Sequence, residues 1–381
     1  MITGIICEYN PLHLGHKKQI DLIRAQDPEG GIVCLMSGNF VQRGQPAIFH
    51  KSLRAEAAVR CGADLVLELP VTYALSSAEG FAAGGVSLLS GFCHNLCFGG
   101  ENADGDAFLE TAKLLLSEAF PEVLRTELDK GLSFPAAREN ALQSLGGDAA
   151  LIASPNNILG VEYCKAILQQ GSQMHPMPIL REGNYHDTAP DTENPSATAV
   201  RQLISQKEAW QDFVPDAARN VFKNAPTHTI AAGERAILAR LRCMTEEEFE
   251  ALPYGSEGLW RKLMHSVRNN GSLEEILTAT KSKRYTRSRL DRMVMCAFLG
   301  IDKATLETPV PYARVLAFND RGREILKVAR TTGNFPNIGE QLEDSYQQLE
   351  NRCGDLYGLF CEDAPEIADA EFNCRIYYHK T

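Results

Sequence analysis

The fold of this chain is decided by residues 2–16, which read ITGIICEYNPLHLGH. Residues 2–7 form a short apolar run that is typical of a buried strand, Asn10-Pro11 interrupts it, and apolar residues return at helical spacing from His16 onward. The same succession continues to about residue 180, with further strands expected at 31–36, 63–69, 95–98 and 178–180. Because strands that alternate with helices are joined by right-handed crossovers, the sequence predicts an α/β fold with a parallel sheet covered on both faces.

The pattern changes twice after this first segment. Residues 206–304 show helical runs with few strand signals, and residues 305–381 return to a strand, expected at 313–318, followed by a turn and a helix. A chain of 381 residues is long enough for two or three domains of about 100–200 residues each. We therefore expect a large domain at 1–205, a mainly helical region at 206–304 and a small C-terminal α/β module at 305–381.

The composition is that of an ordinary folded protein, with 44% hydrophobic and 23% charged residues. It excludes a wholly disordered, collagenous or coiled-coil chain. No apolar run approaches the roughly 18 residues that span a bilayer, and the first residues lack the features of a signal peptide. The 11 cysteines are widely spaced, which favours reduced thiols over a disulfide framework. We therefore expect a cytoplasmic protein without membrane attachment.

Two histidines stand on the turn between the first strand and the first helix. Ligands of α/β sheets bind at the carboxyl ends of the strands, where helix N-termini direct free N–H groups at anions. His13 and His16, separated by Leu14-Gly15, can face one phosphate chain there and donate hydrogen bonds as charge develops in a transition state. Two ordinary loop histidines are the alternative, but the His-x-Gly-His spacing on such a turn favours a catalytic pair.

Two further segments are expected at the same site. Ser196 or Thr198 can cap a helix whose Arg201 reaches a phosphate bidentately, although each is also typical of an ordinary helix start. The glycine-bounded loop 37–44 follows the second strand and should border the same cleft. Its candidate contacts are Ser37, Asn39, Gln42 and Arg43.

Charge is unevenly distributed in a chain whose net charge is −11. Residues 255–292 carry nine basic and four acidic side chains, whereas the first 200 residues carry 13 basic and 23 acidic ones. Lysine and arginine supply most of the affinity for nucleic acid, and a tyrosine can stack on an exposed base. A solvated helix with local ion pairs is the alternative, but Asp291 is the one acid within the densest part. The candidate contacts are Lys281, Lys283, Arg284, Tyr285, Arg287, Arg289 and Arg292.

Several segments occur together in an order that resembles one family. The His-x-Gly-His turn is similar to the signature of nucleotidyltransferases that release pyrophosphate from ATP, and 196–201 resembles their Ser-x-Thr-x-x-Arg helix start. The supporting stretches are EYNPLHLGH at 8–16, MSGNFVQRGQPA at 36–47, GADLVLELP at 62–70, FGGE at 98–101, PNNILG at 155–160 and YHD at 185–187. The chain resembles the bacterial tRNA(Met) cytidine acetate ligase (TmcAL-type) family of the HIGH-motif nucleotidyltransferase superfamily.

The resemblance implies a Rossmann-like HIGH nucleotidyltransferase domain and a two-step reaction. Acetate is activated by ATP to acetyl-adenylate with release of pyrophosphate, and the acetyl group passes to N4 of the wobble cytidine of elongator tRNA(Met), giving N4-acetylcytidine. It implies Mg²⁺ carried by the ATP phosphates, with no prosthetic group and no protein metal ligand. It also implies an ATP site formed by Cys7, Glu8, Tyr9, Asn10, Pro11, Leu12, His13, Leu14, Gly15, His16, Lys17, Lys18, Gln19, Ile20, Gly100, Asn156, Arg181, Ser196, Thr198 and Arg201, with Asn157 as a competitor of Asn156.

Two other interpretations remain open from the sequence. A small-molecule adenylyltransferase of the pantetheine-phosphate or nicotinate-mononucleotide type would share both phosphate motifs, but it has no use for a long basic extension after residue 205. A non-catalytic tRNA-binding protein would tolerate loss of both histidines, and both are present. The Cys93-His94 pair with Cys97 lacks a second ligand pair at zinc-binding spacing, so we predict no metal site there.

Overall fold

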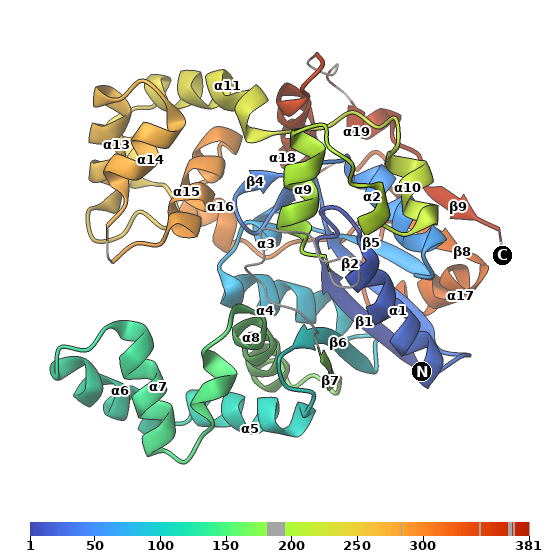
Figure 1. Ribbon diagram of the computed structural model, residues 1–381, viewed down its shortest axis with the longest axis horizontal. Helices are drawn as coiled ribbons and strands as arrows, with labels where there is room; N and C mark the ends of the chain where they lie inside the picture. Colours follow the sequence, from blue (N-terminus) through green and yellow to red (C-terminus); the bar gives the residue numbers. More distant parts are fainter. Residues whose placement is uncertain (181–194, 283, 343, 365–367, 369, 381) are drawn as a thin grey trace.

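The computed structural model describes residues 1–180, 195–282, 284–342, 344–364, 368 and 370–380. Its centre is a seven-stranded sheet in the order β7-β6-β1-β2-β5-β8-β9, in which β8 is antiparallel to β5 and the other pairings are parallel (Figure 1). The strands are β1 (Ile2–Cys7), β2 (Gly31–Ser37), β5 (Leu65–Leu69), β6 (Asn95–Gly100), β7 (His175–Leu180), β8 (Val315–Asn319) and β9 (Tyr377–His379). The predicted α/β class with a Rossmann-like, mostly parallel sheet is confirmed.

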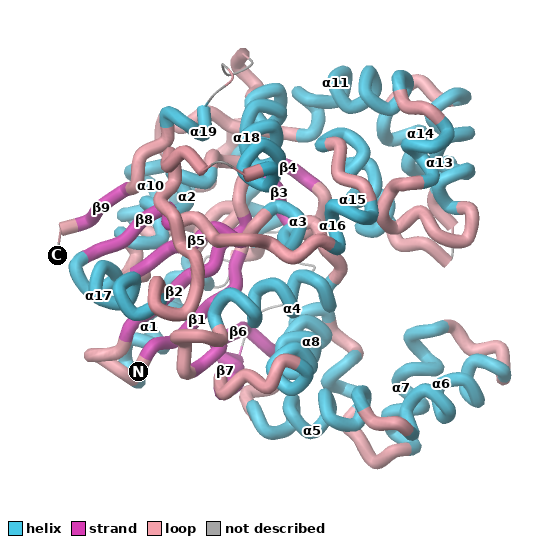
Figure 2. Tube along the Cα trace, turned by 180° about the vertical axis from the view of Figure 1, so that it is seen from behind, coloured by secondary structure: helices cyan, strands magenta, loops and turns pink. Residues whose placement is uncertain are grey.

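Helices cover both faces of this sheet. Successive side chains of a strand point to opposite faces, and here both sets are apolar, so both faces must be buried. Ile6 and Val33 face one core with α4 (Ala78–Leu89), α8 (Pro155–Gln169) and α17 (Asp320–Ala329), whereas Ile5 and Ile32 face the opposite core. The second core is covered by α1 (Leu14–Gln26), α2 (Lys51–Arg60), α9 (Ala197–Ser205) and α10 (Asp216–Phe222). Figures 1 and 2 show these two layers from opposite sides.

The described part of residues 206–304 is mainly helical. It builds a third core around Leu263, Leu290 and Met293. The helices are α11 (Ile230–Cys243), α12 (Glu246–Glu250), α13 (Leu259–Asn269), α14 (Leu273–Thr280), α15 (Arg287–Leu299) and α16 (Lys303–Glu307). A two-stranded hairpin, β3 (Phe40–Val41) and β4 (Gln45–Pro46), and α3 (Val71–Ala74) connect it to the sheet domain.

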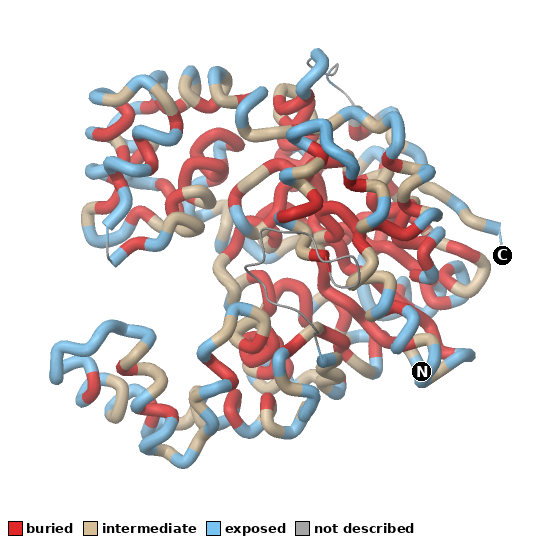
Figure 3. Tube along the Cα trace, in the orientation of Figure 1, coloured by how far each residue is buried: buried red, intermediate tan, exposed pale blue. Residues whose placement is uncertain are grey.

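An arm that the sequence analysis did not anticipate follows β6. It consists of α5 (Gly105–Leu116), α6 (Ala119–Asp129) and α7 (Phe134–Ser144), and its outer helices α6 and α7 are largely exposed (Figure 3). Short 3-10 turns lie at η1 (Ala149–Ile152), η2 (Gln211–Phe213) and η3 (Gly358–Phe360). None of the helices in the described ranges is long and apolar enough to cross a membrane.

The C-terminal segment shares the sheet of the first segment. Its strand β8 pairs with β5, α17 packs on β2, β5 and β8, and α18 (Ser345–Tyr357) and α19 (Ala370–Asn373) follow. The C-terminal segment is therefore joined to the sheet by backbone hydrogen bonds, whereas the expected boundaries at 205 and 305 stay predictions.

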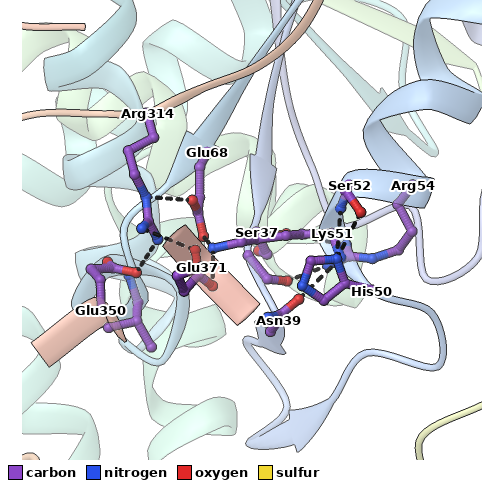
Figure 4. A network of polar contacts seen from close by, with 12 residues as sticks. Ser37, Asn39, His50, Lys51, Ser52, Arg54, Glu68, Arg314, Glu350 and Glu371 are labelled. Atoms are coloured by element: carbon purple, nitrogen blue, oxygen red, sulfur yellow. Dashed lines mark hydrogen bonds and ion pairs between the residues drawn. The ribbon is translucent and has the colours of Figure 1, made fainter. Parts of the chain in front are cut away.

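A buried network of charges joins this segment to β5 and α2 of the first segment (Figure 4). The Lys51 ammonium lies 2.7 Å from Glu68 and 2.6 Å from Glu371, and the Arg314 guanidinium lies 2.9 Å from Glu68, 2.9 Å from Glu350 and 3.1 Å from Glu371. Burial alone would raise the pKa of the Glu68 carboxyl, but Arg314 and Lys51 outweigh it and hold this pKa at about 2. Three carboxylates and two cations therefore stabilise one another away from water.

Removal of one cation from this network should strongly destabilise the fold. Arg314→Met leaves Glu350 and Glu371 short of a partner in the interior, which we expect to lower the free energy of unfolding by about 3–5 kcal/mol in urea titrations. Lys303→Met is the control, because Lys303 is 70% exposed and only 3.9 Å from Glu307, and it should cost less than about 0.5 kcal/mol. Equal stabilities of the two variants would contradict the prediction.

Candidate active site

The histidine turn is an extension of β1 that ends in the cap of α1. Tyr9 has a φ of 43°, a conformation that non-glycine residues seldom adopt outside functional turns. His13 is the N-cap of α1, and its Nδ1 accepts a hydrogen bond from the Gly15 amide at 3.1 Å. His16, at position N3, accepts the His13 amide at its own Nδ1 at 3.3 Å. The two residues thus form a reciprocal capping box in which histidines take the usual roles of Ser and Glu.

This capping box determines the chemistry of both rings. Since each Nδ1 is an acceptor, the neutral imidazoles of His13 and His16 carry their proton on Nε2 and act there as donors. The rings are stacked, with centroids 3.7 Å apart and an angle of 24° between their planes. Tyr9 supports His16 from a ring-centroid distance of 4.9 Å. The turn therefore presents two parallel donors of the kind that stabilises a developing phosphoryl charge.

Both histidines line a cavity of about 290 Å³ at the carboxyl end of β1. Many of the predicted site residues meet there: Cys7, Glu8, Tyr9, Asn10, His13, Gly15, His16, Lys18, Gln19, Gln42, Arg43, Asn156, Ser196, Thr198 and Arg201. Apolar walls come from Ile6, Phe81, Phe98, Leu159 and Tyr163, which the sequence analysis missed because they also read as ordinary core positions.

Other predicted residues lie outside the cavity lining. Leu12 and Ile20 are buried in the core beneath the turn, and Lys17 forms an ion pair with Asp21 on the same helix. Leu14 is the first residue of α1, and Pro11 follows Asn10 through a cis peptide bond. Arg181 and the stretch 185–187 lie outside the described residues.

The start of α9 closes on the histidine turn from the opposite side. Ser196 caps this helix by accepting the Ala199 amide at 3.0 Å. The Arg201 guanidinium donates to the Asn10 carbonyl at 2.6 Å and to the Thr198 hydroxyl at 3.1 Å. Burial lowers the pKa of Arg201, an effect that Glu8 opposes and Arg43 reinforces, and an arginine nevertheless stays cationic at neutral pH. The N-termini of α1 and α9 therefore meet over one positively charged space.

The two asparagines at the start of α8 take different positions. Asn157 is buried and accepts the Glu101 amide at 2.9 Å, which fixes the chain just after Gly100. Asn156 lines the cavity and donates to the Glu101 carboxylate at 2.9 Å. A side chain at Gly100 would come within 3.0 Å of the Asn102 carbonyl, so the residue is needed for close packing at the cavity edge. Of the two alternatives, only Asn156 faces the cavity.

The loop after β2 is held by polar contacts from two sides. Within it, Gln42 and Arg43 line the cavity, whereas Ser37 and Asn39 are buried behind it. The backbone N–H of Gln42 donates to Glu8 Oε1 at 2.8 Å. Asn39 accepts the Lys51 amide at 3.0 Å and so joins the loop to the start of α2. Asn39 therefore supports the loop from within, whereas Ser37 is the buried last residue of β2.

Arg54 is the functional residue that the sequence analysis missed most completely. Its guanidinium is fully buried and donates to the backbone carbonyls of Phe49 at 2.9 Å, Glu8 at 2.6 Å, Ser37 at 3.1 Å and Gly38. It therefore clamps the chain just before the histidine turn to the chain at the start of the cleft loop. In the sequence, Arg54 is one polar position of an ordinary amphipathic helix. Its partners are backbone carbonyls, which every residue type has, so the sequence does not reveal them.

The basic segment is largely ordered by its own ion pairs. Arg287 holds Glu274 through two hydrogen bonds of 2.8 and 2.7 Å and Asp291 at 2.8 Å, and Arg284 lies 2.6 Å from Glu257. Arg289 donates to the Tyr254 carbonyl. Local ion pairs, the alternative considered above, thus occupy part of the segment.

Tyr285 differs from the expectation of an exposed stacking residue. It is only 9% exposed, its hydroxyl donates to Glu257 at 3.2 Å, and Arg289 lies over its ring at 5.0 Å. Arg292 reaches the Gln42 carbonyl at 3.4 Å, and Lys283 lies outside the described residues. Lys281 is exposed at the end of α14, and the Lys262 ammonium lies beside it, 3.2 Å from its carbonyl.

No cluster of three or more His, Cys, Asp or Glu side chains suited to a metal ion occurs within the described residues. The buried thiols of Cys93 and Cys97 have their pKa raised by desolvation, as expected of packing residues.

A family model described as HIGH Nucleotidyl Transferase matches residues 1–370. The chain therefore belongs to the HIGH nucleotidyl transferase family, the class that its sheet and histidine turn define. It is 40% identical over 354 residues to the tRNA(Met) cytidine acetate ligase of Clostridium novyi, covering 88% of each chain, and 38% identical over 394 residues to that of Clostridium tetani, covering 97% and 98%. The chain is thus a member of the tRNA(Met) cytidine acetate ligase family, a family of ligases.

Solved structures agree with this assignment. The crystal structure of Thermotoga maritima TmcAL in its apo form matches with a TM-score of 0.90 and 29% identity over the whole of both chains. The structure of the same protein bound with alpha-thio ATP matches with a TM-score of 0.88 over the same extent. The family resemblance and the expected enzyme class are confirmed.

Shortening the Arg54 clamp should loosen both loops at once. Arg54→Lys keeps the charge but cannot reach all four carbonyls, so we expect a loss of about 2–4 kcal/mol in the free energy of unfolding measured with urea. Arg60→Lys on the same helix is the matched control, because Arg60 is exposed and paired with Glu56, and it should be nearly neutral. An Arg54→Lys variant as stable as the control would refute the clamp.

Proposed function

We propose that this chain is an acetate ligase that forms acetyl-adenylate from acetate and ATP and transfers the acetyl group to N4 of the wobble cytidine of elongator tRNA(Met). The observation that carries the proposal is the pair of Nε2–H donors, His13 and His16, facing Arg201 across one cavity. The alpha-thio ATP bound to the Thermotoga maritima relative supports a nucleotide in this place.

In the first step a carboxylate oxygen of acetate attacks the α-phosphorus of ATP, and pyrophosphate leaves. The imidazoles donate to the phosphoryl oxygens as charge grows, while Arg201 and Arg43 hold the departing phosphates. The N-termini of α1 and α9 would both face the triphosphate of ATP. Positioning and electrostatics therefore supply the catalysis, without a protein nucleophile.

Mg²⁺ would enter with the nucleotide. Glu8 is the one carboxylate among the described cavity residues, so the donor set fits a metal held mainly by phosphates and water.

The histidines should be required for the first step. In His16→Asn the side-chain oxygen can still accept the His13 amide, but the Nε2–H donor is lost. We expect acetate-dependent pyrophosphate release to fall by about 10²–10³-fold with little change in the thermal midpoint. Pyrophosphate release that needs no acetate would favour a small-molecule adenylyltransferase, and unchanged turnover in His16→Asn would contradict the role of the ring.

The exposed part of the basic segment is the proposed tRNA contact. Lys281 and Arg284 are exposed, and reversing both charges should weaken tRNA(Met) binding by about tenfold or more and lower the salt slope by roughly two. Filter binding across salt concentrations measures both quantities. Lys303→Glu, a charge reversal elsewhere in the helical region, is the control. Unchanged binding in the double variant would place the tRNA contact elsewhere.

A further inference from the structure

Glu8 stands out chemically in the cavity. Of the described residues that line it, Glu8 is the one acid, among the donors and cations His13, His16, Lys18, Arg43 and Arg201. A carboxylate repels a triphosphate and an acetate ion, so it weakens binding of both first-step substrates. The presence of this carboxylate therefore suggests a role in a different step of the reaction, one that a negative charge assists.

The structure holds this carboxylate in a defined position. Glu8 follows directly on β1, its carbonyl accepts from Arg54 at 2.6 Å, and its Oε1 accepts the Gln42 amide at 2.8 Å. No hydrogen bond from the described residues reaches Oε2. Glu8 also lies close enough to oppose the lowering of the pKa of Arg201. One carboxylate oxygen is thus anchored, and the other is available to a ligand.

Glu8 lies on the side of the cavity next to the helical region. The backbone N–H of Gln42 donates to Glu8, and the backbone carbonyl of Gln42 accepts from Arg292 of α15 at 3.4 Å. Gly44 of the same hairpin packs so tightly on α15 that a Cβ there would lie 2.5 Å from the Arg292 backbone nitrogen. A nucleobase carried by a polyanion on the basic helical region would therefore enter beside Glu8.

On the basis of the function proposed above, we propose that Glu8 is the catalytic base of the second step and accepts a proton from N4 of the cytosine. The exocyclic amine of cytosine is a hydrogen-bond donor that carboxylates recognise. Its nitrogen is a poor nucleophile because the lone pair is delocalised into the ring, so proton removal during attack assists the reaction.

The step balances without another reactant. N4 attacks the carbonyl carbon of acetyl-adenylate, a C–N bond forms, and the bond between that carbon and the phosphate oxygen breaks. AMP leaves with the electron pair of the broken bond, next to Arg201. One N4 proton passes to Glu8 Oε2 and then to water, which restores the carboxylate.

The test separates the two half-reactions. Glu8→Gln is isosteric and keeps an oxygen for the Gln42 amide. Acetate-dependent ATP–pyrophosphate exchange reports the first step, and single-turnover transfer from synthetic acetyl-adenylate to tRNA(Met) reports the second. We expect transfer by Glu8→Gln to fall by about 10²–10⁴-fold, and by at least about tenfold more than exchange, which reports any contribution of Glu8 to the ATP site.

Glu8→Asp is the conservative variant, and it should restore part of the transfer rate because it keeps a carboxylate at this position. Transfer by Glu8→Gln at the wild-type rate, or an equal loss in both half-reactions with an altered Mg²⁺ requirement, would overturn the role as base. Wild-type protein without acetate-dependent exchange would overturn the proposed function instead, and the inference with it.

Discussion

The Arg54 guanidinium connects the parts of the chain on which the site is built. The chain leaving β1 carries Glu8 and the histidine turn, and the chain leaving β2 carries Gln42 and Arg43. Adjacent parallel strands bring both loops to one edge of the sheet. By donating to the carbonyls of Glu8, Ser37 and Gly38, Arg54 satisfies them and fixes the relative position of the two loops. A buried cation of fixed planar geometry can do this in a way that several separate side chains cannot.

The helix that carries Arg54 is itself held by the charge network of Lys51, Glu68 and Arg314. Lys51 precedes Arg54 by less than one turn of α2, and its ammonium is bound by Glu68 of β5 and Glu371 of α19. Arg314 and Glu350 extend the network to the C-terminal segment. The clamp at the site therefore depends on residues near the end of the chain. The strands β8 and β9 of the same segment extend the sheet of the first segment, while the predicted module boundary at 305 stays a prediction.

Local features of the sequence predicted the site better than they predicted its support. The spacing of His13 and His16, the helix start at Ser196 and the strand-to-loop order at Ser37 act within a few residues, so composition and periodicity reveal them. The contact of Glu68 with Arg314 spans 246 positions, and Arg54 binds backbone oxygens, so neither leaves a pattern in the sequence. Tyr285 shows a further limit of such reasoning. A tyrosine among arginines indicates an exposed stacking surface, but here the ring packs in the helical core, and the arginines pair with acids from α14 and from the loop before α13.

The spacing of the two histidines follows from helix geometry. A capping box joins the N-cap to position N3, so two side chains that cap each other must stand three residues apart, as His13 and His16 do. In this box each Nδ1 is occupied as an acceptor, which leaves Nε2 as the second nitrogen of each ring. In the first step proposed above, the two rings would donate to the phosphoryl group as charge accumulates, while Arg201, Arg43 and the helix N-termini would balance the resting charge of the nucleotide. The hydrogen bonds that begin α1 therefore also orient both imidazole rings. A serine and glutamate box would cap the helix equally well, but it would place an anion where the phosphates must lie.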